Sequence, residues 1–198
     1  MRLALFSIVV LFCFPVAARS QGPLDVPRYE AGLQFDFNYL DGVGEWGGGF
    51  GARFHYNFDR HFAFDSELLY RQHNVSAFSG ATPALATVGQ TTGLFGLRVG
   101  QRSGEVGFFA HARAGFLHFG TDNGQTLLTR TTVPAFDLGG TLEHYAGPVI
   151  LRLDIGEMVV PYGHVAVSPG PFSVMPLPSL PLGTRASPSV GFGIAFRF

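Results

Sequence analysis

The strongest constraint in this sequence is an alternation of apolar and polar residues with a period of two. In the segment EAGLQFDFNYL, residues 30–40, Leu33, Phe35 and Phe37 alternate with polar residues. A β-strand points successive side chains to opposite faces, so this segment gains one apolar and one polar face. A helix would instead need apolar residues three and four positions apart. The pattern therefore predicts strands.

Eight segments share this alternation, and each is about nine to fourteen residues long, the length that a tilted membrane strand needs. They cover residues 30–40, 46–58, 62–71, 91–100, 106–119, 134–145, 149–159 and 189–198. Short connections alternate with long ones at 74–90, 120–132 and 161–187, although the first outer connection, 41–45, is short. Short turns on one side and long loops on the other are typical of outer-membrane barrels. We expect an all-β fold, an eight-stranded antiparallel up-and-down transmembrane β-barrel.

The first twenty residues have the pattern of an export signal. Arg2 precedes an apolar core, and small residues follow near Ala18. We expect a cleaved signal peptide at 1–20, a short periplasmic segment at 21–28 and the barrel at 29–198. The only cysteine, Cys13, lies in the signal peptide, so the mature chain has no disulfide and no cysteine-based metal site.

Composition agrees with membrane strands. Hydrophobic residues make up 46% of the chain and charged residues 14%, yet no stretch after residue 20 is long enough for a membrane helix. The formal net charge of −1 gives no electrostatic basis for binding nucleic acid.

The polar faces of the strands carry opposite charges on mostly neighbouring strands. An eight-stranded interior is only wide enough for side chains to fill it, and arginine pairs well with carboxylates. We therefore predict an ion-pair network that plugs the lumen, formed by Glu30, Asp36, Arg53, Asp65, Glu67, Arg71, Arg98, Arg113, Asp137, Glu143, Arg152, Asp154 and Arg197. The alternative for the same charges is a narrow channel for small solutes.

One constellation allows an enzymatic alternative. His118, Thr132 and Glu157 are expected near the outer ends of adjacent strands, facing lipid. A histidine beside a hydroxyl can activate it for acyl transfer, as a lipid A-modifying barrel enzyme would require. The other interpretation is a set of polar residues at the level of the lipid headgroups. Otherwise we expect no catalytic residue and no cofactor. We also expect no metal site, because the histidines lack metal-binding spacing.

The last outer loop is unusual in composition. Seven of the 13 prolines fall between Pro161 and Pro188. Proline favours extended polyproline II geometry, and exposed apolar loops often contact other molecules. The segment from Pro161 to Ser187 could dock on a partner, on the headgroup layer or across the barrel mouth, or be a disordered loop.

The chain ends in VGFGIAFRF, in which Phe192, Ile194, Phe196 and Phe198 occupy every second position. With the eight amphipathic segments, this ending resembles that of small outer-membrane β-barrel proteins such as OmpX and the transmembrane domain of OmpA. The resemblance implies a bacterial outer-membrane location and recognition of the four residues by the barrel assembly machinery, with periplasmic chaperones as transient partners. It also implies contact with outer-membrane lipid and lipopolysaccharide, a monomeric state, and a non-enzymatic role in envelope integrity or surface interaction.

Overall fold

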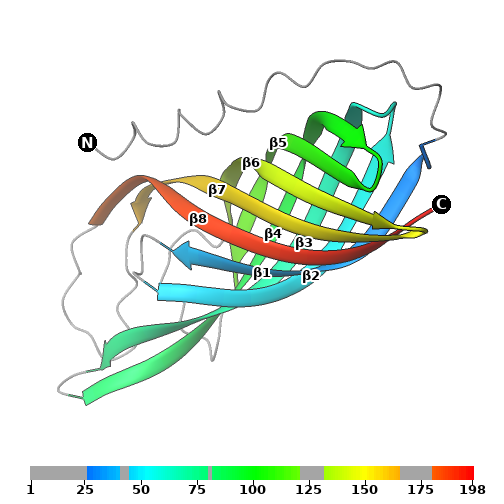
Figure 1. Ribbon diagram of the computed structural model, residues 1–198. Helices are drawn as coiled ribbons and strands as arrows, with labels where there is room; N and C mark the ends of the chain where they lie inside the picture. The colour runs from blue at the N-terminus through cyan, green and yellow to red at the C-terminus, as the bar shows by residue number, and fades with distance from the viewer. Residues whose placement is uncertain (1–25, 41–44, 80–81, 121–131, 166–179) are drawn as a thin grey trace.

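The computed structural model describes residues 26–40, 45–79, 82–120, 132–165 and 180–198. These ranges contain eight strands: β1 (Tyr29–Leu40), β2 (Glu45–Asn57), β3 (Phe62–Ser79), β4 (Thr82–Ser103), β5 (Val106–Phe119), β6 (Thr132–Ala146), β7 (Val149–Val165) and β8 (Leu180–Arg197). Consecutive strands pair in antiparallel fashion, and β8 pairs with β1 to close the barrel (Figure 1). The predicted eight-stranded antiparallel barrel is confirmed. A search of the same ranges for a helix that could cross a membrane finds none.

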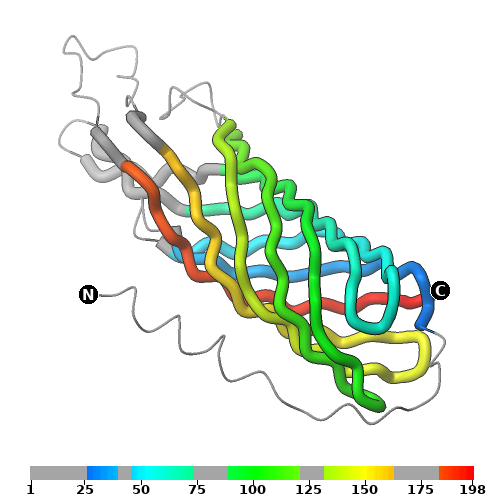
Figure 2. The backbone as a smooth tube through the Cα atoms, turned by 90° about the horizontal axis from the view of Figure 1, so that it is seen from above, coloured from blue at the N-terminus to red at the C-terminus, as the bar shows by residue number. Residues whose placement is uncertain are grey.

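The strands are inclined to the barrel axis, as the backbone trace shows (Figure 2). Their stagger follows from the pairing. Stepping from Ala63 on β3 to its partner on each next strand leads around the barrel through Arg98, His111, Gly139, Gly156, Ser189, Asn38 and Gly47. Because Gly48 pairs with Gln72, the path returns to β3 at His73, ten residues further along (73 − 63 = 10). Such a stagger requires the strands to tilt, so that an eight-stranded sheet closes around a narrow interior.

The two ends of the barrel differ. At one end, here called the turn end, short turns join β2 to β3, β4 to β5 and β6 to β7, and the last strand finishes at Arg197. Gly104 and Gly147 lie in two of these turns with φ of 61° and 63°, a backbone conformation that glycine adopts without strain. In the β2–β3 turn, Asp59 accepts hydrogen bonds from the backbone N–H groups of His61 and Phe62 at 2.6 and 2.8 Å. The opposite end is called the loop end.

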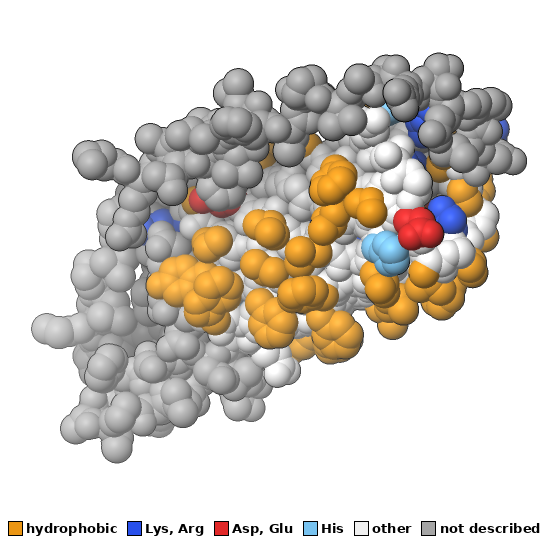
Figure 3. Space-filling model, in the orientation of Figure 1, with side chains coloured by type: hydrophobic (Ala, Val, Ile, Leu, Met, Phe, Trp, Pro, Cys, Tyr) orange, Lys and Arg blue, Asp and Glu red, His pale blue; other side chains and the backbone are white. Residues whose placement is uncertain are grey.

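The outer face of the barrel is a band of large apolar side chains (Figure 3). Leu33, Phe50, Phe108 and Leu138, from four different strands, are each more than half exposed. Aromatic pairs lie toward both ends, with ring centroids 5.5 Å apart for Tyr29 and Tyr56 at the turn end, and 5.6 Å apart for Tyr39 and Trp46 at the loop end. An apolar band between aromatic girdles is the surface that a bilayer solvates.

Two connections differ from the prediction. Residues 74–90 were expected to form a loop, but β3 continues to Ser79 and β4 starts at Thr82. Residues 161–187 were likewise expected to be a loop, yet β7 extends to Val165 and β8 begins at Leu180. Backbone pairing continues past the point where the apolar face ends, because hydrogen bonds between strands do not depend on side-chain polarity.

Two other predictions fall on the remaining parts of the chain. The signal peptide, 1–20, and the centre of the proline-rich segment, 166–179, lie outside the described residues. Cleavage of the first and docking of the second stay predictions.

Candidate functional site

Charged side chains fill the barrel interior from the turn end to the level of Asp36 and Arg71. They occupy inward-facing positions of β1 to β7, opposite the apolar outer face. Seven carboxylates and six arginines lie there, each with a side chain no more than 8% exposed: Glu30, Asp36, Asp65, Glu67, Asp137, Glu143 and Asp154, with Arg53, Arg71, Arg98, Arg102, Arg113 and Arg152. Buried ions of this number must be paired, because desolvation of an unpaired charge is costly.

Glu30 on β1 is the hub of the cluster nearest the turn end. Its Oε2 accepts hydrogen bonds from Nη2 of Arg98 at 2.9 Å and from Nη2 of Arg152 at 2.5 Å. Its Oε1 accepts one from Nη2 of Arg102 at 3.0 Å. Arg98 and Arg152 also donate to Glu143, the latter through Nε at 2.6 Å. Two carboxylates and three guanidinium groups therefore join strands from opposite sides of the barrel.

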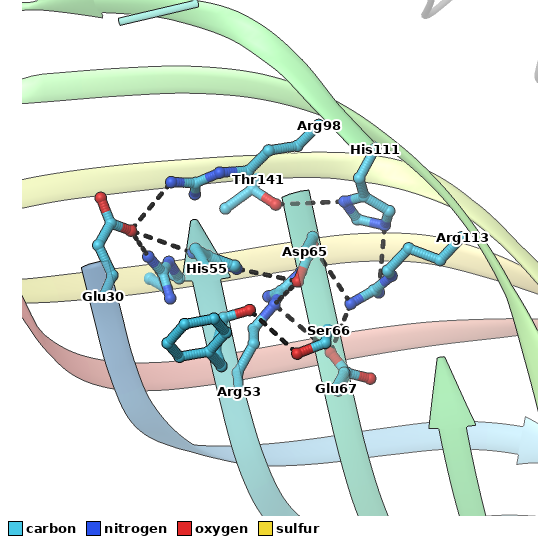
Figure 4. Close-up of polar contacts among 12 residues, drawn as sticks. Glu30, Arg53, His55, Asp65, Ser66, Glu67, Arg98, His111, Arg113 and Thr141 are labelled. Atoms are coloured by element: carbon cyan, nitrogen blue, oxygen red, sulfur yellow. Dashed lines mark hydrogen bonds and ion pairs between the residues drawn. The ribbon is translucent and has the colours of Figure 1, made fainter. Parts of the chain in front are cut away.

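A second cluster lies further along the interior (Figure 4). Arg53 on β2 donates from Nε and Nη2 to the two oxygens of Asp65 at 3.0 and 2.8 Å, a bidentate pair. Arg113 on β5 donates to Glu67 at 2.6 Å and to Asp137 at 2.7 Å. Each arginine thus links separate strands and holds side chains across the interior.

Two histidines extend these clusters. The ring of His55 lies between Glu30 and Asp65, with its nitrogens 3.0 and 2.9 Å from their oxygens (Figure 4). It therefore connects the two clusters. His111 places Nε2 2.9 Å from Asp137. When both histidines are neutral, the net charge of the seven carboxylates and six arginines is −1 (6 − 7).

The structure brings together twelve of the thirteen residues predicted for this network. Arg197 is the correction: it lies at the turn end, donates from Nε to the carbonyl oxygen of Gly147 at 2.8 Å, and stacks on Tyr145. Within the described residues, Arg197 pairs with no carboxylate. The physical reason is that β8 ends at Arg197, where a backbone carbonyl of the adjacent turn is closer than the buried carboxylates.

Arg102 was missed by the sequence reasoning, which placed it in a turn. Instead β4 continues to Ser103, and Arg102 reaches inward to Glu30 and Asn57. The sequence did contain a signal for this position. Arg102 lies four residues after Arg98, and residues an even number apart in a strand point to the same face.

A group of potential metal ligands lies within the first cluster. Ligand atoms of Glu30, His55 and Glu143 come within 4.8 Å of one another. Both carboxylates already accept hydrogen bonds from Arg98 and Arg152. The positive charges of these two guanidinium groups repel a metal cation. We therefore interpret the two carboxylates as partners of the arginines and not as metal ligands.

The three residues of the enzymatic alternative are only partly assembled. On the outer face, Nδ1 of His118 lies 2.8 Å from Oγ1 of Thr132, a hydrogen bond between β5 and β6. Glu157 on β7 pairs with Leu138, which is six residues along β6 from Thr132 (138 − 132 = 6). That separation is about 20 Å along a strand. The histidine and the hydroxyl therefore form a pair, and Glu157 does not orient the imidazole.

The four residues of the expected assembly signal lie on the apolar outer face of the chain's last strand and at its end. Phe192, Ile194 and Phe196 on β8, and Phe198 after it, are each more than 40% exposed. Their recognition by an assembly machinery stays a prediction.

Comparison with known proteins adds evidence on the fold. No protein-family model matches the chain, and no curated protein matches it either. The crystal structure of the outer membrane protein OprG from Pseudomonas aeruginosa is similar, with a TM-score of 0.59 at 9% identity, covering 89% of this chain and 98% of that one. The structure of Neisserial surface protein A (NspA) gives a TM-score of 0.51 at 13% identity, covering 86% of this chain and 96% of that one. The closed barrel, its apolar outer band and these similarities together show that this chain has the fold of the small eight-stranded outer-membrane β-barrels.

Proposed function

We propose that this protein is an exported outer-membrane barrel of bacteria, without enzymatic activity, whose lumen is closed by ion pairs and does not conduct. Its outer loops serve surface interaction, and its barrel contributes to the integrity of the envelope. Outer-membrane lipid and lipopolysaccharide surround it as a monomer, and the barrel assembly machinery and periplasmic chaperones act during its biogenesis.

The proposal of a closed lumen rests on one observation: pairs of arginines and carboxylates connect opposite walls of the interior. Arg53 on β2 contacts Asp65 on β3 and, at 2.6 Å, Asp154 on β7. Arg152 on β7 contacts Glu30 on β1. The internal cavity found beside these residues has a volume of about 10 Å³, on the scale of a single water molecule. A continuous column of water would have to displace side chains that hold each other by charge-assisted hydrogen bonds.

Single-channel recording in planar bilayers tests this proposal. We expect no steady conductance from the unsubstituted protein, and leak currents from the double variant Arg53→Ala with Asp65→Ala, which removes one charge of each sign from the interior. The matched control, Arg28→Ala with Glu105→Ala, also removes one charge of each sign, but from exposed positions, and should stay closed.

Two results would contradict the proposal. A steady conductance of the unsubstituted protein would support the narrow channel. A silent double variant, shown to be folded by its heat-dependent migration on a gel, would mean that the ion pairs are not what closes the lumen.

The hydrogen bond between His118 and Thr132 is the one observation that favours the enzymatic alternative. Mass spectrometry of lipid A from cells with the unsubstituted protein and with His118→Ala separates the two functions. We expect identical lipid A, because the pair lacks an acid to orient it. A change in acylation that depends on His118 would establish the enzyme instead.

A further inference from the structure

The hairpin of β3 and β4 extends beyond its neighbouring strands at the loop end (Figure 1). The ladder between β2 and β3 ends at Gly48 and Gln72, whereas β3 continues to Ser79. These seven further residues (79 − 72 = 7) extend about 24 Å along the strand. From Asn74 to Ser79, β3 pairs only with β4 in the described part of the chain. The other edge of this part of β3 therefore has no strand beside it there.

This edge of β3 presents backbone hydrogen-bonding groups. At the start of the hairpin, Gly100 donates its N–H to the carbonyl oxygen of His61 at 2.9 Å, and the pairing of β3 with β4 has no register shift up to Ser79. Because backbone groups alternate sides along an antiparallel strand, the odd-numbered residues of β3 face β4 and the even-numbered ones face away. Beyond Gln72, the residues that direct N–H and C=O away from β4 are Asn74, Ser76 and Phe78. We name this row of backbone groups the β3 edge.

The β3 edge lacks the features that normally prevent pairing between sheet edges. Exposed edges of natural sheets are usually protected by charged residues, by proline or by a bulge. The sequence contains no aspartate, glutamate, lysine or arginine between Arg71 and Arg98. None of the three residues of the edge is a proline, and the ladder beside them is regular. The outer edge of β4 differs, because Pro83 has no N–H to donate and Gly89 already accepts a hydrogen bond from Gly120.

A second copy of this chain fits the β3 edge. A segment without charges can lie against its own copy without repulsion between like charges. An antiparallel pair of β3 edges, related by a twofold axis, places Ser76 opposite Ser76 of the second copy and Asn74 opposite Phe78 of the second copy. Both members of each such pair direct N–H and C=O toward each other, which is the arrangement of a hydrogen-bonded antiparallel pair.

The direction of β3 decides where the second copy lies. This strand runs from the turn end to the loop end, so antiparallel pairing needs a copy whose loop end points the opposite way. Copies in one membrane would run β3 in parallel and place identical residues at one height, whereas parallel pairing offsets the bonded residues by one. The second copy must therefore lie in a facing membrane.

We propose that the β3 edge joins two copies of this protein from facing membranes, by antiparallel strand pairing centred on Ser76. This pairing rests on the proposed role of the outer loops in surface interaction, and it specifies a second copy as the partner. Hydrogen bonds between the two main chains supply the attraction, as in other recognition by strand addition. Each barrel stays a monomer within its own bilayer, because only the projecting hairpins meet.

A cysteine at residue 76 tests the pairing directly. The chain from residue 21 onward contains no cysteine of its own. Opposed residues of a hydrogen-bonded antiparallel pair have Cα atoms about 5.5 Å apart, within the range of a disulfide. The full mature protein is placed in lipid nanodiscs, one barrel in each disc, and oxidised mildly. We expect Ser76→Cys to form disulfide-linked dimers, whereas Thr87→Cys, an odd-numbered residue that pairs with Asn74 across the same hairpin, should stay monomeric.

Charged substitutions test the symmetry of the pair. In sedimentation of the nanodiscs, the unsubstituted protein should form a two-disc species whose population rises with concentration. Ser76→Lys alone and Ser76→Asp alone should each weaken association at least about threefold, because like charges then lie opposite each other. A mixture of these two variants should restore association, because opposite charges then meet. Thr87→Lys is the matched control on the same hairpin and should leave association unchanged.

Three results would overturn the proposal. They are equal disulfide yields from Ser76→Cys and Thr87→Cys, no two-disc species of the unsubstituted protein, and a mixture of the charged variants that associates no better than either variant alone. Heat-dependent gel migration shows that each variant is folded before it is compared. Planar-bilayer recording measures the lumen and disc association measures the β3 edge, so the proposed closed lumen and the proposed pairing can fail separately.

Discussion

Replacing Glu30 by glutamine tests whether the ion pairs carry the stability of the barrel. The substitution keeps the shape of the side chain and removes one negative charge. Glu30 is 1% exposed and lies within hydrogen-bond distance of Arg98, Arg102 and Arg152. Removing the carboxylate leaves these guanidinium groups with only Glu143 as a counter-charge in the cluster.

The expected loss follows from that geometry. Breaking a buried ion pair by removing one partner costs about 3–5 kcal/mol, because the remaining charge stays desolvated. Native proteins are stable by only about 5–15 kcal/mol, so Glu30→Gln should unfold at a much lower denaturant concentration. Adding Arg102→Met removes one of the uncompensated charges, so the double variant should lose about 0.5–3 kcal/mol less than the sum of the two single losses.

Equilibrium unfolding by urea in lipid vesicles measures these differences. Trp46 is the only tryptophan of the chain and is 58% exposed on the outer face, so its fluorescence reports transfer from lipid to water. Glu105→Gln, in the exposed β4–β5 turn, is the matched control and should change the free energy of unfolding by no more than about 0.5 kcal/mol. A loss below about 1 kcal/mol for Glu30→Gln would refute the reasoning, since the network would then contribute no more than an exposed pair.

Three further outcomes are expected. Hydrogen bonds from two backbone N–H groups hold the pKa of Asp59 below its usual value. The ionised carboxylate therefore stabilises the folded state above its ordinary pKa, and this stabilisation is lost as the pH falls through the lowered pKa. The free energy of unfolding, measured from pH 7 to 3, should depend less on pH in Asp59→Asn. Gly139→Ala should fold poorly, because its Cβ would lie 2.5 Å from a carbonyl oxygen of β7, whereas Gly140→Ala should be tolerated with its nearest contact at 3.6 Å, as heat-dependent gel migration would show. Phe198→Ala should slow insertion by the purified assembly machinery, while Phe58→Ala, equally apolar and exposed at the turn end, should not; equal rates would remove the assembly role.

The fold was predictable because a membrane barrel repeats one simple rule. Lipid on the outside demands apolar side chains at every second position, as in Leu33, Phe35 and Phe37, and the period of the strand assigns every residue between them to the interior. That rule also separated the buried charges from the apolar face, and it selected Arg53 and Asp65 without any knowledge of their contacts.

The strand ends could not be found in this way. Where the chain leaves the bilayer, both faces meet water and the alternation loses its physical cause, so β3 and β4 continue through residues that were expected to form a loop. Arg102 and Arg197 were misplaced for the same reason, since each lies at a strand end.

The sequence by itself determined the strand count, the two faces of each strand and the near balance of interior charge, because these depend on period and composition alone. The tertiary structure decided which charges meet, since the ten-residue stagger brings residues such as Arg152 and Glu30 from distant parts of the chain to one level. It also decided that ion pairs fill the interior from the turn end to Arg71 and Asp36, while inward side chains of β4 to β7 nearer the loop end form an apolar cluster. Strand parity cannot show this division, because it assigns a residue to the interior but not to a height within it.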